Sequence, residues 1–264
     1  MPQLSGIRTT HARAGRTAPR RVGRRGGRRA GHTPVVGSEP ATAERHYARD
    51  SVEFSRAIAF FDAVYAFAVT LLVVNLDPPA ASDWSSLATL LDSGLEWQLL
   101  GFAISFVVIA AFWRVNHRIV AGFRGLSSAT IVANLVATAF VVLIPFTTQG
   151  ISDIDTSDEP LAIALYAVNI SCATLAQSAM YYVALHDGMV AYPLPRRAAV
   201  ARLLDVLVTP AVFLASIPIA YTYGATAARY TWALLIVLSP ISGALASRRI
   251  ARVLTEESRT PERS

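Results

Sequence analysis

An arginine and an aspartate stand near the start of a long apolar segment. Arg56 and Asp62 lie within the run that continues to Leu76. Charged side chains are costly at membrane depth, and those that occur there usually pair with other groups or take part in ion or proton movement. Because Arg56 and Asp62 are six residues apart, their side chains point about 120° away from each other on a helix. Each is therefore expected to find its partner on another element.

A second polar group stands near the end of the next apolar segment, in the order Trp113, Arg114, Asn116, His117. If the two segments run in opposite directions across a membrane, this group lies at the same depth as Asp62. The arrangement allows two interpretations. One is a polar clamp that fixes helix packing, and the other is a gate support or a proton site.

Composition assigns the chain to the integral membrane proteins. Of its 264 residues, 53% are hydrophobic and 16% are charged, against about 25% charged residues in soluble domains. The one cysteine, Cys172, excludes a disulfide framework and a cysteine metal site. No phosphate loop, nucleophile elbow or zinc-protease motif occurs. We therefore expect no enzyme activity and no bound cofactor or metal.

Six apolar segments approach the ~20 residues that a bilayer requires. The connections between them alternate between acidic stretches without arginine and stretches with arginine. Arginine marks the cytoplasmic side, so the sequence predicts an all-α membrane protein with both termini in the cytoplasm. The expected spans are 54–76, 95–115, 129–148, 160–185, 198–222 and 228–247.

The first 50 residues differ from the rest of the chain. They contain 11 of the 24 arginines against three acidic residues and show no periodicity. We predict a basic, disordered cytoplasmic tail over 1–50, a six-helix domain over 51–250 and a cytoplasmic tail over 251–264. The basic run could contact anionic lipid or nucleic acid, but we expect it to fix topology and expect no specific nucleic acid partner.

The first span carries two stripes at helical spacing. One is bulky, with Phe67, Leu71 and Val74 at i, i+4 and i+7. Taken alone, such a stripe is typical of a surface that faces lipid or the protein core. The other stripe consists of small side chains, which permit helices to approach closely. It comprises Ala59, Ala63, Ala66 and Thr70.

The first span also carries a longer motif. The pattern Arg56-xxx-Phe60-Phe61-Asp62-Ala-Val-x-Ala-Phe67-xx-Thr70-Leu71-Leu resembles the R-xxx-F-S-D-G/A-V-x-A-I-xx-T-L-L signature of the transmembrane protein 175 potassium channels, in their prokaryotic single-repeat form. Supporting similarity comes from the second and third spans. It comprises Ser105-Phe106, Trp113-xx-Asn116-His117-Arg118, Asn134 and Leu143-Ile144-Pro145-Phe146.

The resemblance implies a homotetramer whose first helices line a central pore. The constriction would be formed by apolar side chains on that helix, here Phe67, Thr70, Leu71 and Val74. The polar cluster that holds the pore helix would comprise Arg56, Phe60, Asp62, Trp113, Asn116 and His117. This chain departs from the motif in three places: Phe61 replaces a serine, Asn116 replaces a histidine, and Phe67 replaces the constriction isoleucine.

We therefore predict a potassium-permeable cation channel, multi-pass in a bacterial plasma membrane, with other copies of itself, membrane lipid and potassium ions as partners. One alternative is a proton-coupled transporter or proton-conducting protein that uses Asp62 and His117. The sequence lacks the midplane acidic cluster and the clear inverted repeats that favour a transporter. Another alternative is a non-conducting membrane protein whose basic tail binds nucleic acid or lipid.

Overall fold

The computed structural model describes residues 46–153 and 155–259. The chain divides into two units, Met1–Thr42 and Ala43–Ser264, and the second unit contains every described residue. Most of the predicted basic tail, residues 1–45, lies outside the described residues, as do the last five residues of the chain.

The described residues contain six helical spans that are long and apolar enough to cross a membrane. This confirms the all-α membrane fold class. The first two spans and the fourth and fifth are single helices, whereas the third and the sixth each consist of two helices in succession. In chain order the helices are α1 (Val52–Val74), α3 (Leu95–Ala121), α4 (Ser128–Val142) with α5 (Ile144–Ser152), α6 (Pro160–His186), α7 (Arg196–Tyr223), and α8 (Ala225–Trp232) with α9 (Leu234–Arg259).

Three spans differ in detail from the sequence prediction. The second continues to Ala121 rather than ending at residue 115. The third is interrupted at Leu143, between α4 and α5, because Pro145 lies in the first turn of α5 and cannot donate a backbone hydrogen bond to the preceding turn. The sixth starts at Ala225 rather than at residue 228. Its second helix, α9, continues to Arg259 and so includes most of the predicted C-terminal tail.

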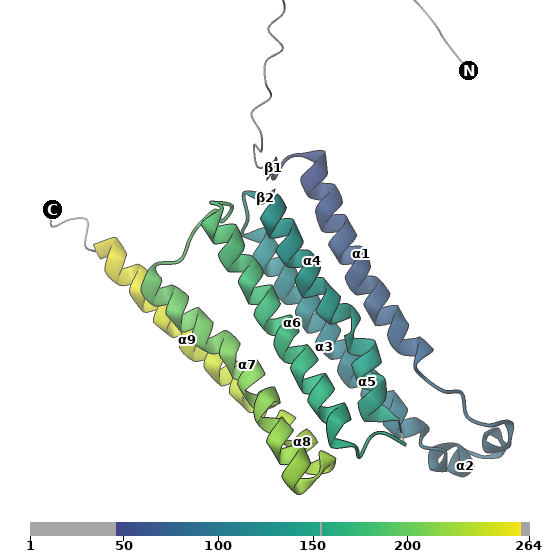
Figure 1. The fold of residues 1–264 in the computed structure, drawn as a ribbon. Helices are drawn as coiled ribbons and strands as arrows, with labels where there is room; N and C mark the ends of the chain where they lie inside the picture. The colour runs from purple at the N-terminus through teal and green to yellow at the C-terminus, as the bar shows by residue number, and fades with distance from the viewer. Residues whose placement is uncertain (1–45, 154, 260–264) are drawn as a thin grey trace, which may run out of the picture. The chain divides into compact units, whose positions relative to one another are not determined.

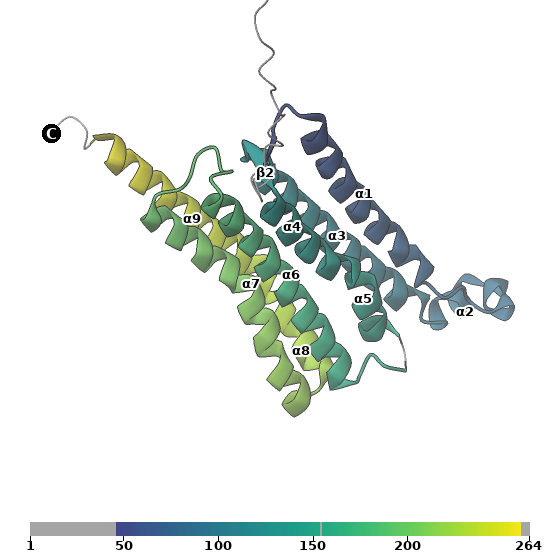
Figure 2. The same ribbon diagram turned by 45° about the horizontal axis from the view of Figure 1, so that its top comes forward.

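Successive spans run in alternating directions, as Figure 1 shows. Helix α6 packs against α4 and α7, and α7 packs in turn against α9. Helix α1 packs against α3 and α4, and Figures 1 and 2 both show it on the side of α3 and α4 away from α7 and α9. One face of α1 is therefore left without a neighbour in the described chain.

The two ends of the bundle carry different short elements. At the end where α1 starts, strand β1 (His46–Ala48) pairs in antiparallel fashion with β2 (Gly125–Ser127). Gly125 is required there, because a Cβ atom would lie 2.6 Å from the Tyr47 carbonyl oxygen. At the other end, a 3-10 helix, η1 (Ala81–Ser85), and helix α2 (Leu87–Asp92) connect α1 to α3. The sequence predicted neither the ribbon nor these short helices.

Three apolar clusters of described residues hold the spans together, and two of them include residues of α1. The first joins α1, α3, α4, α6 and α7 around Tyr65, Ile109 and Tyr166. The second lies nearer the β ribbon and includes Phe54 and Met180. Both of these clusters contact α1, so the position of this helix depends on packing along its whole length.

Candidate functional site

Helix α1 has a defined start. Ser51 is its N-cap, and the Ser51 hydroxyl accepts a hydrogen bond from the backbone N–H of Phe54 at 3.1 Å. Such caps satisfy backbone donors that the first turn leaves unpaired. The 23 residues that follow contain neither proline nor glycine, so nothing in the sequence interrupts the helix across the apolar layer.

The two sides of α1 have different surroundings. One side is buried against the rest of the bundle, and its residues follow helical spacing. The opposite side has no neighbour in the described chain over about five turns. The buried residues are Phe54, Phe61, Tyr65, Ala68 and Leu72. The uncovered ones include Arg56, Ala59, Phe60, Ala63, Ala66, Phe67, Thr70 and Val74.

Most of the predicted pore residues lie on the uncovered side. Phe67 is 62% exposed and Val74 is 77% exposed. Thr70 lies between them, and its hydroxyl donates to the Phe67 carbonyl of its own helix at 2.8 Å. Leu71 is half-buried at the edge of the uncovered side. The surface that these four residues present is therefore mainly apolar, with one hydroxyl turned back on the backbone.

Three of the predicted cluster residues meet between α1 and α3. The indole Nε1–H of Trp113 donates to the Asp62 Oδ1 atom at 2.8 Å. The Trp113 ring lies against the His117 imidazole, with 5.7 Å between the centroids. The tryptophan thus connects the carboxylate of α1 to the histidine of α3, and the Asp62 charge has a donor inside the membrane span.

The other three predicted residues are not part of this contact. Arg56 and Phe60 are exposed, and Arg56 makes no hydrogen bond or ion pair with any residue that the structure describes. Asn116 is buried at 3% exposure, and its Oδ1 atom bonds to no described group. In a single chain, three of the six residues are therefore in contact with one another. The other three lie outside this contact.

A second polar contact holds the buried side of α1. The Gln177 Nε2 group of α6 donates to the Tyr65 hydroxyl at 3.3 Å and to the Phe112 carbonyl at 2.9 Å. Near the end of α1, the Asn75 side chain donates to the Pro145 carbonyl at 2.8 Å. The sequence analysis did not select Gln177, Tyr65 or Asn75. The available signal was a glutamine inside an apolar segment, which must find partners in a membrane.

A cavity of about 310 Å³ lies at the end of α1 away from the ribbon. Its lining includes the carboxylates Asp77, Asp153 and Asp155 together with the amides of Asn75 and Gln98. Among the described residues no group of three or more histidine, cysteine or acidic side chains is close enough to hold a metal ion. The acidic lining of the cavity would attract cations electrostatically.

Comparison with known proteins places this geometry in a family. The family model described as "Endosomal/lysosomal potassium channel TMEM175" matches residues 56–145, which include α3, α4 and most of α1. Over these residues, about a third of its length, the chain is similar to the TMEM175 family. The match begins at the arginine of the first-span motif and ends at the proline that breaks the third span.

Two relatives of this chain are named as potassium channels. One, from Chryseobacterium sp., is 26% identical over 121 residues, which are 46% of this chain and 59% of the relative. The other, from Streptomyces collinus, is 27% identical over 139 residues, which are 52% of this chain and 66% of the relative. The chain thus spans somewhat less than two thirds of the length of each.

A solved structure shares the fold. It is a lysosomal potassium-selective channel TMEM175 homolog from Chamaesiphon minutus, with a TM-score of 0.58 and 21% sequence identity. The likeness covers 74% of this chain and 99% of that chain. The predictions of family and fold class are therefore confirmed.

Proposed function

We propose that this chain forms a potassium-permeable cation channel in a bacterial plasma membrane. Four copies assemble around an axis, and α1 of each copy lines the pore. The proposal is supported by the match of residues 56–145 to a potassium channel family and by two bacterial relatives named as potassium channels.

The observation that carries the proposal is the uncovered side of α1. It continues from Arg56 to Val74 on the helix that carries the family motif. Its middle and far parts combine small residues, which allow close approach between copies, with the large apolar side chains of Phe67 and Val74. Copies packed through the small residues would bring the Phe67 rings toward a common axis.

An apolar ring of this kind acts on ions through water. A hydrophobic constriction excludes water when it is narrow, and ions cannot pass until it widens or wets. Phenyl rings from Phe67 would fill more of the axis than isoleucine side chains would. Their faces also carry partial negative charge, which favours cations. The Trp113–Asp62 contact would hold α1 at a fixed rotation, so that Phe67 points toward the axis.

Flux from liposomes tests the proposal. Purified full-length protein is reconstituted into liposomes that contain potassium, and efflux is followed with a dye that reports compensating proton entry through a protonophore. We expect efflux down the potassium gradient that is faster than the matched sodium efflux and needs no pH gradient. Absence of flux would refute the channel.

The same assay addresses the alternative of a proton-coupled transporter that uses Asp62 and His117. The two side chains make no direct hydrogen bond with each other, because Trp113 lies against both. If potassium movement requires an imposed pH gradient, the transporter replaces the channel as the function of this chain.

Phe67→Ala tests the constriction. Removal of the four rings should increase total flux or reduce the preference for potassium over sodium. The matched control is Phe106→Ala on α3, where an exposed ring is removed from a different helix. Identical flux and selectivity in wild type and Phe67→Ala would place Phe67 away from the constriction.

A further inference from the structure

Three chain segments interlock at the end of the bundle where α1 starts. Residues 46–51 lead into α1, residues 121–127 connect α3 to α4, and residues 187–191 leave α6. The first segment pairs with the second through the β ribbon. The second is tied to the third by backbone hydrogen bonds from Arg124 N–H to the Met189 carbonyl, 2.7 Å, and from Ala191 N–H to the Gly122 carbonyl, 2.9 Å.

Arginine side chains complete these backbone ties. Arg49 donates to the carbonyls of Ala121, at 2.7 Å, and Phe123, at 2.6 Å. Arg124 donates to the carbonyls of Val190, at 3.0 Å, and Ala191, at 3.3 Å. A shift of the α6 exit would therefore move the ribbon, and with it the residues immediately before α1.

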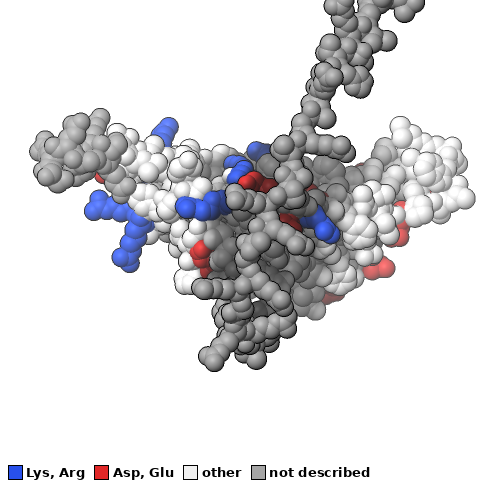
Figure 3. All heavy atoms as spheres, turned by 90° about the horizontal axis from the view of Figure 1, so that it is seen from above, with Lys and Arg blue, Asp and Glu red and all other residues white. Residues whose placement is uncertain are grey.

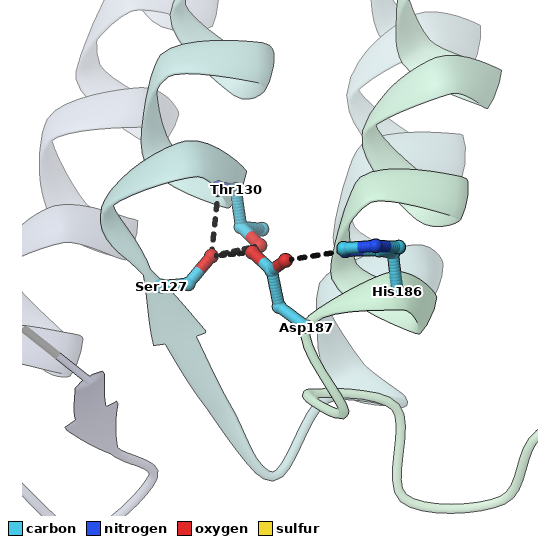
Figure 4. Close-up of polar contacts among 4 residues, drawn as sticks. All are labelled: Ser127, Thr130, His186 and Asp187. Carbon is cyan, nitrogen blue, oxygen red and sulfur yellow. Dashed lines mark hydrogen bonds and ion pairs between the residues drawn. The ribbon is translucent and has the colours of Figure 1, made fainter. Parts of the chain in front are cut away.

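Asp187 lies at the centre of the junction (Figure 4). Its carboxylate accepts a hydrogen bond from the Ser127 hydroxyl and lies 3.1 Å from the His186 Nδ1 atom. The Ser127 hydroxyl also caps α4, by accepting the backbone N–H of Thr130 at 3.0 Å. In the ribbon, Ser127 is the partner of His46. One carboxylate thus contacts the end of α6 and the start of α4, beside the first strand.

Charge reinforces this arrangement. The Ser127 hydroxyl, followed by the hydrogen bond from His186 and the charges of His186 and His46, holds the pKa of Asp187 below its usual range despite partial burial. Asp187 is therefore ionised near neutral pH. Strand β2 and the first turn of α4 bring no titratable side chain to it. The nearby Arg124 guanidinium is bonded to the α6 exit.

We propose that Asp187 is a positioning residue that forms a proton-sensitive latch between α6 and the ribbon that precedes α1. Histidine is the side chain whose charge ordinarily changes between about pH 5 and 8. Here the His186 ring contacts the carboxylate, and His46 lies on the strand that pairs with Ser127. A positive charge on His46 attracts Asp187 from the ribbon side and tightens the latch, whereas a charge on His186 acts from the same side as Asp187 and supports its ionised form. Protonation of Asp187, at much lower pH, releases it.

The latch extends the proposed function and rests on it in one respect. If α1 lines the pore, then the ribbon sets the position of the pore helix at its first turn, because only Arg49, Asp50 and Ser51 separate β1 from α1. Ion flux should then depend on pH through the junction. The latch itself concerns the attachment of the ribbon and can be measured without any ion.

Hydrogen–deuterium exchange of the full-length protein in lipid nanodiscs tests the latch. The readout is protection of residues 46–51 and 125–127, corrected for the intrinsic effect of pH on exchange. Asp187→Asn keeps the size and an acceptor but removes the charge, and it should speed exchange there on the order of tenfold. The control, Asp92→Asn, neutralises an exposed carboxylate at the other end of the bundle and should leave the ribbon unchanged.

The histidines supply the second arm. In the wild type, protection of the ribbon should be greater at about pH 6 than at about pH 8. The double variant His46→Gln with His186→Gln should lose this difference while remaining folded, since neither imidazole belongs to an apolar cluster. Unchanged ribbon exchange in Asp187→Asn, or protection that rises with pH, would overturn the latch.

Flux measured on the same samples separates the two proposals. Absence of potassium flux together with the expected exchange pattern overturns the channel and leaves the latch intact. Potassium flux together with unchanged exchange in Asp187→Asn overturns the latch and leaves the channel intact. If both hold, Asp187→Asn should also flatten the pH dependence of flux.

Discussion

At the residue scale, the contact between Trp113 and Asp62 is the best-defined part of the predicted cluster. Trp113→Phe keeps the aromatic contact with His117 and removes only the N–H donor. A hydrogen bond to a charged group is worth roughly 1.5–3 kcal/mol, and partial exposure lowers this to about 1 kcal/mol. We expect a lower thermal unfolding temperature in detergent.

The control for this prediction is Trp84→Phe. Trp84 is exposed in η1, and its indole N–H donates to the Pro79 carbonyl at 3.3 Å. The same chemical change there should alter the unfolding temperature less. Equal shifts for the two variants would mean that the Asp62 contact contributes no specific stabilisation.

Gln177 provides a second test at this scale, on the buried side of α1. Gln177→Leu retains the approximate volume and removes the donor to the Tyr65 hydroxyl and the Phe112 carbonyl. Because Tyr65 is only 2% exposed, its hydroxyl would be left without that partner, at a cost of about 1–3 kcal/mol. Thermal unfolding measures the loss, and exposed Gln149→Leu is the control. An unchanged unfolding temperature for Gln177→Leu would contradict this prediction.

At the element scale, the two sides of α1 predict an alternating pattern of reactivity. Cys172→Ser gives a cysteine-free background, because the chain has one cysteine. Single cysteines at Phe67, Thr70 and Val74 should react with a charged thiol reagent in the assembled channel and reduce flux. Cysteines at Ala68 and Leu72, on the buried side, should react slowly. Equal labelling along the helix would exclude a pore on one side of α1.

The same helix shows what could be predicted from sequence. Its length and apolar character can be read directly from the sequence. The placement of Phe67 and Val74 on one side follows from their helical spacing, which depends only on residues close together in the chain. The sequence predicts that the partner of Asp62 lies at the polar end of the second span. It does not identify Trp113 rather than His117 or Asn116, because that choice depends on the relative rotation of two helices.

The ribbon and the latch could not be predicted for a related reason. Each strand has three residues, and the partners are about 80 residues apart. Such short strands carry no usable alternation of polar and apolar residues. No motif in the sequence distinguishes Asp187, and only the meeting of α6, α4 and the ribbon gives it partners. The break between α4 and α5 at Leu143 is easier to predict from sequence, because Pro145 signals it directly.

At the scale of the whole molecule, the spans differ in how far the described chain covers them. The most apolar 18-residue stretch is 44% buried in the fourth span, and 11% and 22% buried in the second and first. A helix can face lipid on all sides, but α1 also leaves Arg56 uncovered within the span. An unpartnered charge facing lipid is costly, and in the proposed assembly the uncovered side of α1 contacts other copies or water.

The proposed tetramer gives the last prediction. Four chains of 28.4 kDa make a particle of about 114 kDa, which native mass spectrometry from detergent can distinguish from smaller oligomers. The small residues on the uncovered side of α1 allow copies to approach closely, so Ala63→Trp should shift the population toward monomers. Ala244→Trp places the same bulk on an exposed position of α9 and should leave the tetramer intact. A tetramer that tolerates tryptophan at residue 63 would require an interface on another helix, and α1 could then no longer surround the axis.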